Sequence, residues 1–168
     1  MNYSETLNFI HSLGNFGLPA GLDRIKKVLE ILGNPQNDFK SIHIAGTNGK
    51  GSVTTFLASI FKEAGYKTGS FISPYIIDFR ERIQICGEFI SETDLVKYAQ
   101  IVKDTGVTLT EFEFITAVAF LYFKENKIDI LICETGLGGR LDATNTLENL
   151  AATVITKIGL DHTAVLGD

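Results

Sequence analysis

The sequence predicts an α/β domain whose sheet is mostly parallel and flanked by helices. Strand-like and helix-like patterns alternate along the 168 residues, which is typical of this fold class. Residues 41–72 follow the order strand, glycine loop, helix, strand, the length of a βαβ unit with parallel strands. Residues 128–133 form an uninterrupted apolar run, as expected of a strand buried on both faces.

Two helices are expected before the first strand. Asn2 and Glu5 fit a capping box, and the apolar residues of 3–13 fall on one helical face. A glycine-rich loop at 14–21 leads to a second amphipathic stripe at 22–32, which Gly33 ends. We therefore expect one ATP-binding domain over 1–168, made of a helical segment at 1–40 and a core at 41–168.

The first βαβ unit is predicted from its loop and its apolar spacing. A strand at 41–45 runs into a glycine loop at 46–52, and a helix follows at 53–64 before a strand at 68–72. The side chains expected to point inward from this helix are Val53, Phe56, Leu57, Ile60 and Phe61.

Turn and cap signals divide the second half of the chain. Ser73-Pro74 breaks it, and 82–90 reads as a small hairpin around Cys86-Gly87. Ser91 caps a helix over 94–102, and a second capping box opens a helix from 110 to about 125. Strands follow at 128–133 and 151–156, with a polar glycine-rich loop at 134–145 between them.

Composition excludes several classes of function. The net charge is −5, with 20 acidic and 15 basic residues, so the chain lacks the basic footprint of nucleic-acid binding. No apolar run reaches the 18 residues of a membrane span, and no signal peptide is evident. Cys86 and Cys133 do not make a disulfide framework. We expect a cytoplasmic protein with reduced thiols and no nucleic-acid or membrane partner.

The loop at 46–52 has the features of a phosphate-binding loop. It follows a strand and opens a helix, and its glycines let backbone N–H groups converge on an anion. Lys50 would contact the β- and γ-phosphates and Ser52 would bind Mg²⁺. The strict Walker pattern fails at Ile44 and Gly51, so a glycine-rich turn without a ligand stays open. The expected nucleotide-binding residues are Gly46, Thr47, Asn48, Gly49, Lys50, Gly51 and Ser52.

This loop and four other motifs resemble the folate branch of the Mur-ligase-like amide-bond synthetases, the folylpolyglutamate and dihydrofolate synthases. The motifs occur in the family's order and span essentially the whole chain. They are GLDR at 21–24, FISPY at 71–75 with FRERI at 79–83, ETGLGGRLDATN at 134–145 and GLDHT at 159–163. The resemblance implies the P-loop NTPase-like fold of the Mur ligase central domain. The sequence differs from the family pattern at Tyr75, where many relatives carry His, so the role of the Tyr75 side chain is open.

The resemblance also implies a Mg²⁺ site and catalytic residues. It makes Ser52, Ser73, Glu134 and His162 the metal ligands, and Lys50, Glu134 and His162 the catalytic residues. The residues themselves allow simpler roles: a cap of the next turn for Glu134 and a Ser-Pro turn for Ser73. A lone histidine is a weak candidate ligand for Mg²⁺. His43 reads as a packed, hydrogen-bonded core residue and His11 as a surface residue.

The acceptor substrate is expected, again by resemblance, along three segments. Glu113 is equally explained by the capping box with Thr110, and Asp142 by an Asx-turn. The expected substrate-binding residues are Leu18, Pro19, Ala20, Gly21, Thr110, Glu111, Phe112, Glu113, Leu141, Asp142 and Ala143.

The implied activity is ATP-dependent addition of L-glutamate to a folate or dihydropteroate carboxylate through an acyl phosphate, with ATP and Mg²⁺ as cofactors. The chain stops soon after His162, so we expect an N-terminal portion that lacks the C-terminal glutamate-binding domain and is inactive alone. The full-length protein is expected to be a monomer. Three alternatives stay open: another Mur-type ligase, a nucleotide-binding fragment without catalysis, and a P-loop GTPase, which the absence of an Asn-Lys-x-Asp motif disfavours. The sequence leaves open whether the acceptor is dihydropteroate, a folate or both.

Overall fold

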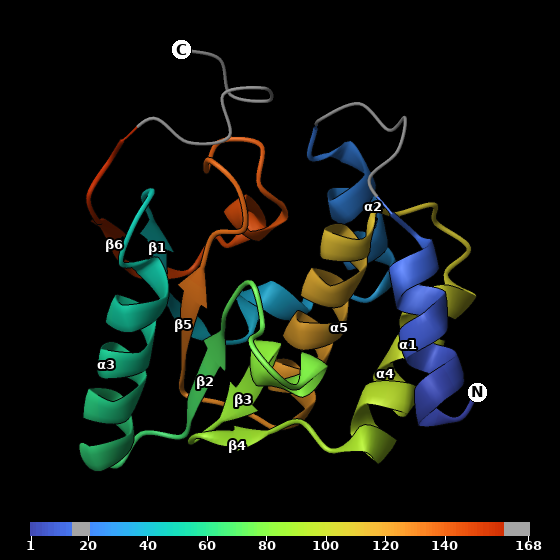
Figure 1. The fold of residues 1–168 in the computed structure, drawn as a ribbon, viewed down its shortest axis with the longest axis horizontal. Coiled ribbons are helices and arrows are strands. Elements are labelled where there is room, and N and C mark those ends of the chain that lie inside the picture. Colours follow the sequence, from blue (N-terminus) through green and yellow to red (C-terminus); the bar gives the residue numbers. More distant parts are fainter. Residues whose placement is uncertain (15–20, 160–168) are drawn as a thin grey trace.

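The computed structural model describes residues 1–14 and 21–159 and is built around a mixed β-sheet (Figure 1). Within these residues the sheet has six strands in the order β4-β3-β2-β5-β1-β6. Strands β1, β2, β5 and β6 are parallel, whereas β3 and β4 form an antiparallel hairpin on β2. The predicted α/β fold with a small hairpin insertion is therefore confirmed. The strands are β1 (Lys40–Ala45), β2 (Thr68–Phe71), β3 (Ile83–Ile85), β4 (Glu88–Phe89), β5 (Ile130–Glu134) and β6 (Leu150–Ile155).

Strand β5 lies between the two strands of the first βαβ unit. It pairs with β1 on one side and with β2 on the other, and every residue of β5 is buried. In the β1–β5 register Ile44 lies opposite Glu134. The carboxyl ends of β1 and β5 therefore meet at one rim, where ligands of open α/β sheets gather.

Helices cover the two faces of the sheet unequally. Helix α3 (Lys50–Glu63) packs on one face against Ile42, Ile44, Ile130 and Ile132. On the other side of the sheet lie α1 (Tyr3–Ser12), α2 (Asp23–Ile31), α4 (Glu92–Asp104) and α5 (Glu111–Glu125) (Figure 1). Buried side chains of α1 and α2 belong to the same core as those of α4 and α5, so the segment at 1–40 has no separate core.

Local signals set the element ends as predicted. Capping boxes begin α1 and α5, and Ser91 caps α4. The hairpin turn places Cys86 and Gly87 at positive φ, as a two-residue turn between twisted strands requires. Three short 3₁₀ helices were not predicted: η1 (Pro35–Asn37), η2 (Phe79–Arg82) and η3 (Ala143–Thr146).

Both cysteines are free thiols, and within the described ranges no helix is long and apolar enough to cross a bilayer.

The inward face of α3 was predicted wrongly in part. The helix begins at Lys50 rather than at 53, and Phe56 and Ile60 are 68% and 61% exposed. The face that packs on the sheet is centred on Thr54, which is fully buried and donates its hydroxyl to the carbonyl of Lys50 over 2.9 Å. At about 100° per residue, Phe56 and Ile60 then fall on the solvent side. The apolar pattern does not include the buried threonine, and it therefore misplaced these two residues.

Gly69 on β2 offers a test of the core packing. A Cβ there would lie 2.7 Å from Ile128 Cδ1 and 3.1 Å from the ring of Phe123. We expect Gly69→Ala to lower the free energy of unfolding by about 1–3 kcal/mol, because overpacking forces its neighbours to move. Urea denaturation measures this change. Gly139→Ala is the control, since a Cβ there meets nothing within 4 Å; equal stability of both variants would contradict the packing described.

Candidate functional site

The loop between β1 and α3 is braced against the end of β6. The backbone N–H groups of Thr47 and Asn48 donate to the carbonyl of Lys157 over 2.9 and 3.3 Å. Gly46 has φ 137°, and a Cβ there would lie 2.0 Å from Thr156 Oγ1. Only glycine fits this contact, so the loop lies close to the segment that follows β6.

Lys50 begins α3 and folds back over the loop that precedes it. Its Nζ donates to the carbonyl oxygens of Gly46 over 2.8 Å and of Thr47 over 3.3 Å. Ser52 lies in the same first turn and is exposed. Backbone N–H groups at a helix N-terminus and an ammonium group together favour an anion. The start of α3 together with Lys50 therefore has the charge of a phosphate-binding site.

Glu134 ends β5 beside this loop. Its side chain is buried, and Oε2 accepts the backbone N–H of Ser73 over 3.1 Å. A Cβ on Gly51 would lie 3.5 Å from Oε2, so the first turn of α3 passes close by. Burial raises the pKa of Glu134, while the Ser73 hydrogen bond and the charge of Lys50 oppose the rise. The structure thus brings Lys50, Ser73 and Glu134 to one rim.

These residues fit a hard divalent cation. Glu134 is a buried carboxylate without an ion pair among the described residues, and hydroxyl and carboxylate oxygens are what Mg²⁺ prefers. The described part of the chain contains no cluster of three or more His, Cys, Asp or Glu side chains. Few protein ligands suffice for Mg²⁺, which is commonly held by one or two protein groups together with phosphates and water. The predicted ligand His162 lies outside the described residues.

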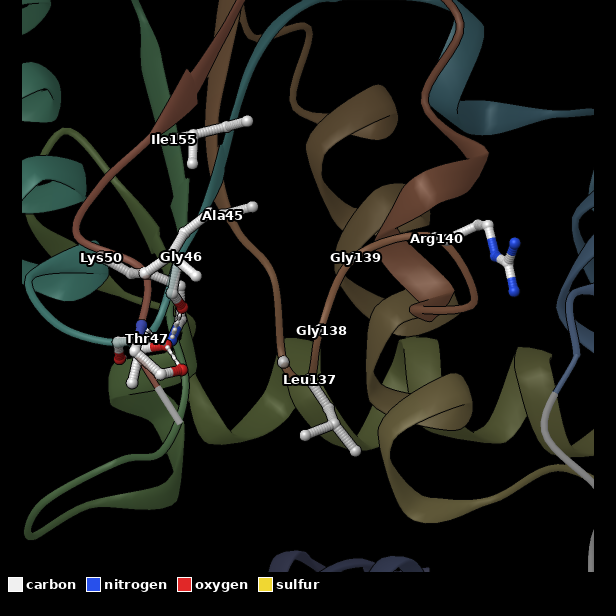
Figure 2. A pocket seen from close by; sticks show the side chains of 12 residues that line it. Ala45, Gly46, Thr47, Lys50, Leu137, Gly138, Gly139, Arg140 and Ile155 are labelled. Atoms are coloured by element: carbon white, nitrogen blue, oxygen red, sulfur yellow. Dashed lines mark hydrogen bonds between the residues drawn. The ribbon is translucent and has the colours of Figure 1, made fainter. Parts of the chain in front are cut away.

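A pocket of about 380 Å³ separates the phosphate loop from the glycine-rich loop after β5. Figure 2 shows Thr47 and Lys50 on one side and Leu137, Gly138 and Arg140 on the other. Ile155, Ile158 and Gly159, from the end of β6 and beyond, complete the lining. The sequence prediction missed this third contribution, although the carboxyl end of a parallel strand is itself the signal that points to it.

Asp142 organises the loop on the far side of the pocket. It is buried, its Oδ2 accepts the backbone N–H of Leu137 over 2.8 Å, and its Oδ1 accepts that of Thr144 over 3.0 Å. The Asx-turn interpretation of this residue is therefore what the structure shows. Of the neighbouring predicted contacts, Leu141 is exposed and Ala143 is buried.

The predicted acceptor residues on α5 have structural partners. Glu113 is buried, closes the capping box with Thr110 and forms an ion pair with Arg24 at 3.0 Å. Phe112 contacts Phe71, and a Cβ on Gly136 would lie 2.5 Å from its ring. This close contact sets the N-terminus of α5 against the glycine loop. Glu111 lies 3.5 Å from His11 and 4.0 Å from Arg82. Leu18, Pro19 and Ala20 lie outside the described residues, whereas Gly21 begins the second described range.

Searches against known proteins identify relatives whose sequences align with nearly the whole chain. No family model matches it. The chain is 46% identical over 99% of its length to the dihydrofolate synthase/folylpolyglutamate synthase of Bacillus subtilis, of which it covers 40%. It is 38% identical to the folylpolyglutamate synthase of Lacticaseibacillus casei and 43% identical to the dihydrofolate synthetase of Saccharomyces cerevisiae, covering 41% and 37% of them. The chain thus spans about two fifths of the length of these relatives.

Solved structures agree with these relatives and with the fold. A folylpolyglutamate synthase from Thermotoga maritima matches at 40% identity with a TM-score of 0.88, over 94% of this chain and 38% of that one. Escherichia coli FolC in complex with DHPP and ADP matches at 34% identity with a TM-score of 0.94, over 100% and 41% of the two chains. A folylpolyglutamate synthase complex with AMPPCP and folate matches at 38% identity with a TM-score of 0.93, over 100% and 43%.

The burial of Glu134 predicts a pH-dependent effect of its charge on stability. Because the pKa of Glu134 is raised in the folded state, stability is lost as the pH rises from the ordinary pKa of a glutamate to this raised value. We expect Glu134→Gln to raise the Tm by about 2–4 °C at neutral pH, equivalent to about 1 kcal/mol in a domain of this size. The gain should vanish below about pH 3, where the carboxyl is protonated in both the folded and the unfolded state. Thermal denaturation across this range measures it.

Glu88→Gln is the matched control, since Glu88 is exposed on β4. It removes the same charge without removing a buried one, so we expect no pH-dependent gain from it. A Glu134→Gln variant that is less stable than the parent at neutral pH would contradict the electrostatic cost assigned to Glu134.

Proposed function

We propose that this chain, which is homologous over its whole length to the N-terminal portion of folylpolyglutamate and dihydrofolate synthases, carries the ATP–Mg²⁺ site of an ATP-dependent ligase. The ligase would join L-glutamate to the carboxylate of a folate or of dihydropteroate. The observation that carries the proposal is the phosphate loop with Lys50, which faces the buried Glu134 across one rim of the sheet. Solved relatives in complex with ADP, AMPPCP and folate support it.

In this function the phosphate loop, residues 46–52, binds the nucleotide. Lys50 would leave the carbonyls of Gly46 and Thr47 and contact the β- and γ-phosphates. Ser52, Ser73, Glu134 and His162 would hold Mg²⁺, which neutralises charge on the phosphates when bound. The glycine loop 136–140 would close the far side of the pocket.

The reaction needs activation of a carboxylate, which is a poor electrophile. The acceptor carboxylate would attack the γ-phosphate, releasing ADP and forming an acyl phosphate. The amine of glutamate would then attack the acyl carbon and phosphate would leave. The protein's part is to position the reactants and to compensate charge, with Lys50 as the cation that this chain supplies.

The acceptor would lie along three segments of the chain: 18–21, 110–113 and 141–143. Glu113 already pairs with Arg24, and Asp142 already accepts a backbone N–H group of the glycine loop. We therefore propose that they act mainly by shaping these segments. Glutamate would bind to a portion of the ligase that corresponds to the part of the relatives not covered by this chain. We further propose a cytoplasmic protein that is monomeric at full length and has small molecules as partners.

Lys50→Ala tests the nucleotide site. We expect the parent chain to bind ATP·Mg²⁺ in isothermal titration calorimetry, and Lys50→Ala to bind about ten- to a hundredfold more weakly. Hydrogen bonds to charged groups contribute about 1.5–3 kcal/mol, which sets this range. Lys62→Ala, at the exposed far end of the same helix, is the control. Unchanged affinity of Lys50→Ala would reject the phosphate-loop assignment.

A turnover assay tests the division of labour. We expect these 168 residues to bind nucleotide without ligation, because they span two fifths of the relatives' length. Coupled ADP release is measured with glutamate and either dihydropteroate or tetrahydrofolate. Acceptor- and glutamate-dependent ADP release at enzymatic rates would overturn this expectation and would also identify the acceptor. A peptidoglycan-precursor substrate in the same panel separates the other Mur-type ligases.

A further inference from the structure

His43 is a buried titratable side chain that neither the phosphate site nor apolar packing requires. It lies on β1, close before the phosphate loop, and is 8% exposed. In the sheet register it lies opposite Cys133 of β5. As predicted from the sequence, it is a hydrogen-bonded core residue, and its partner is Thr144 of η3, with 2.8 Å between Nε2 and Oγ1. Burial lowers the pKa of His43 and the charge of Asp142 opposes this, so the imidazole lies in the field of that carboxylate.

The direction of this hydrogen bond follows from the next partner. The Thr144 hydroxyl also bonds to Asp142 Oδ1 in a short contact. An ionised carboxylate only accepts hydrogen bonds, so Thr144 donates its proton to Asp142 and accepts from His43. His43 is therefore the tautomer that carries its proton on Nε2.

The hydrogen bonds continue to the wall of the pocket. Asp142 Oδ2 accepts the backbone N–H of Leu137, which lines the pocket opposite Lys50 (Figure 2). The path from His43 through Thr144 and Asp142 to Leu137 thus links β1 to the glycine loop. Since β1 also carries the phosphate loop, one strand sets the position of both walls.

We propose that His43 is a positioning residue that, through Thr144 and Asp142, holds the glycine loop 136–140 at its distance from the phosphate loop. An ordinary core histidine would add stability to the whole domain. A positioning residue has a local signature, because its loss loosens one loop and leaves the sheet intact. The role of the loop as a substrate wall rests on the proposed function, whereas the hydrogen-bond path stands without it.

Amide hydrogen exchange followed by NMR separates the two roles. In His43→Leu we expect the amides of Leu137 and Thr144 to exchange at least tenfold faster, while those of Ile42 and Ile132 in the sheet keep their protection. His43→Gln places an amide N–H near the position of Nε2, and we expect it to restore slow exchange. Thr6→Val is the control, because it removes a hydroxyl that is equally buried but distant in α1. Unchanged exchange at Leu137 in His43→Leu, or equal acceleration in Thr6→Val, would overturn the proposal.

Two measurements keep the test decisive if His43→Leu does not fold. Nitrogen NMR of the parent chain must show His43 protonated on Nε2, and the Nδ1–H tautomer would overturn the path. Thr144→Val must shift the Nε2–H resonance and speed exchange at Leu137; no change in either would also overturn it. Failure of the parent to bind ATP·Mg²⁺ would reject the proposed function instead, since none of these readouts uses a nucleotide.

Discussion

The parallel pairing of β1 with β5 is the constraint on which the rest of the structure depends. It places Ile44 beside Glu134, so that the chain leaves both strands at the same rim. The phosphate loop follows β1 directly and the glycine loop follows β5 directly. Paired residues of neighbouring parallel strands lie at the same level in the sheet. Lys50, which follows β1, and Glu134, which ends β5, therefore lie at the same rim without a long connection.

Three buried carboxylates in this part of the molecule either accept backbone N–H groups or pair with a cation. Glu134 accepts the N–H of Ser73, Asp142 accepts that of Leu137, and Glu113 pairs with Arg24. An unpaired buried carboxylate would be costly, so each of these contacts also fixes a segment in place. Asp142 accepts three hydrogen bonds and Glu113 pairs with Arg24, whereas Glu134 has one hydrogen bond and no ion pair among the described residues. This difference favours Glu134 as the group that meets a metal.

Much of the fold was predictable because its signals are local. Capping boxes, a positive-φ turn and the uninterrupted apolar run of β5 involve residues only a few positions apart, and all of them were confirmed. Helix α3 was the exception. Thr54 is polar by type yet fully buried, whereas Phe56 and Ile60 are apolar yet exposed. An apolar pattern cannot reveal a hydroxyl that bonds within its own helix.

From the sequence by itself came the order of helices and strands along the chain, the prediction of a phosphate loop with Lys50 and the resemblance to folate-branch ligases, since these depend on residue type and spacing. Only the tertiary structure decided that Glu134 is buried against Ser73 and that His43 reaches Thr144. The physical reason is separation: His43 and Thr144 are 101 residues apart, and Ser73 and Glu134 are 61 apart. Such contacts exist only once the sheet brings distant strands and loops together, and no local pattern encodes them.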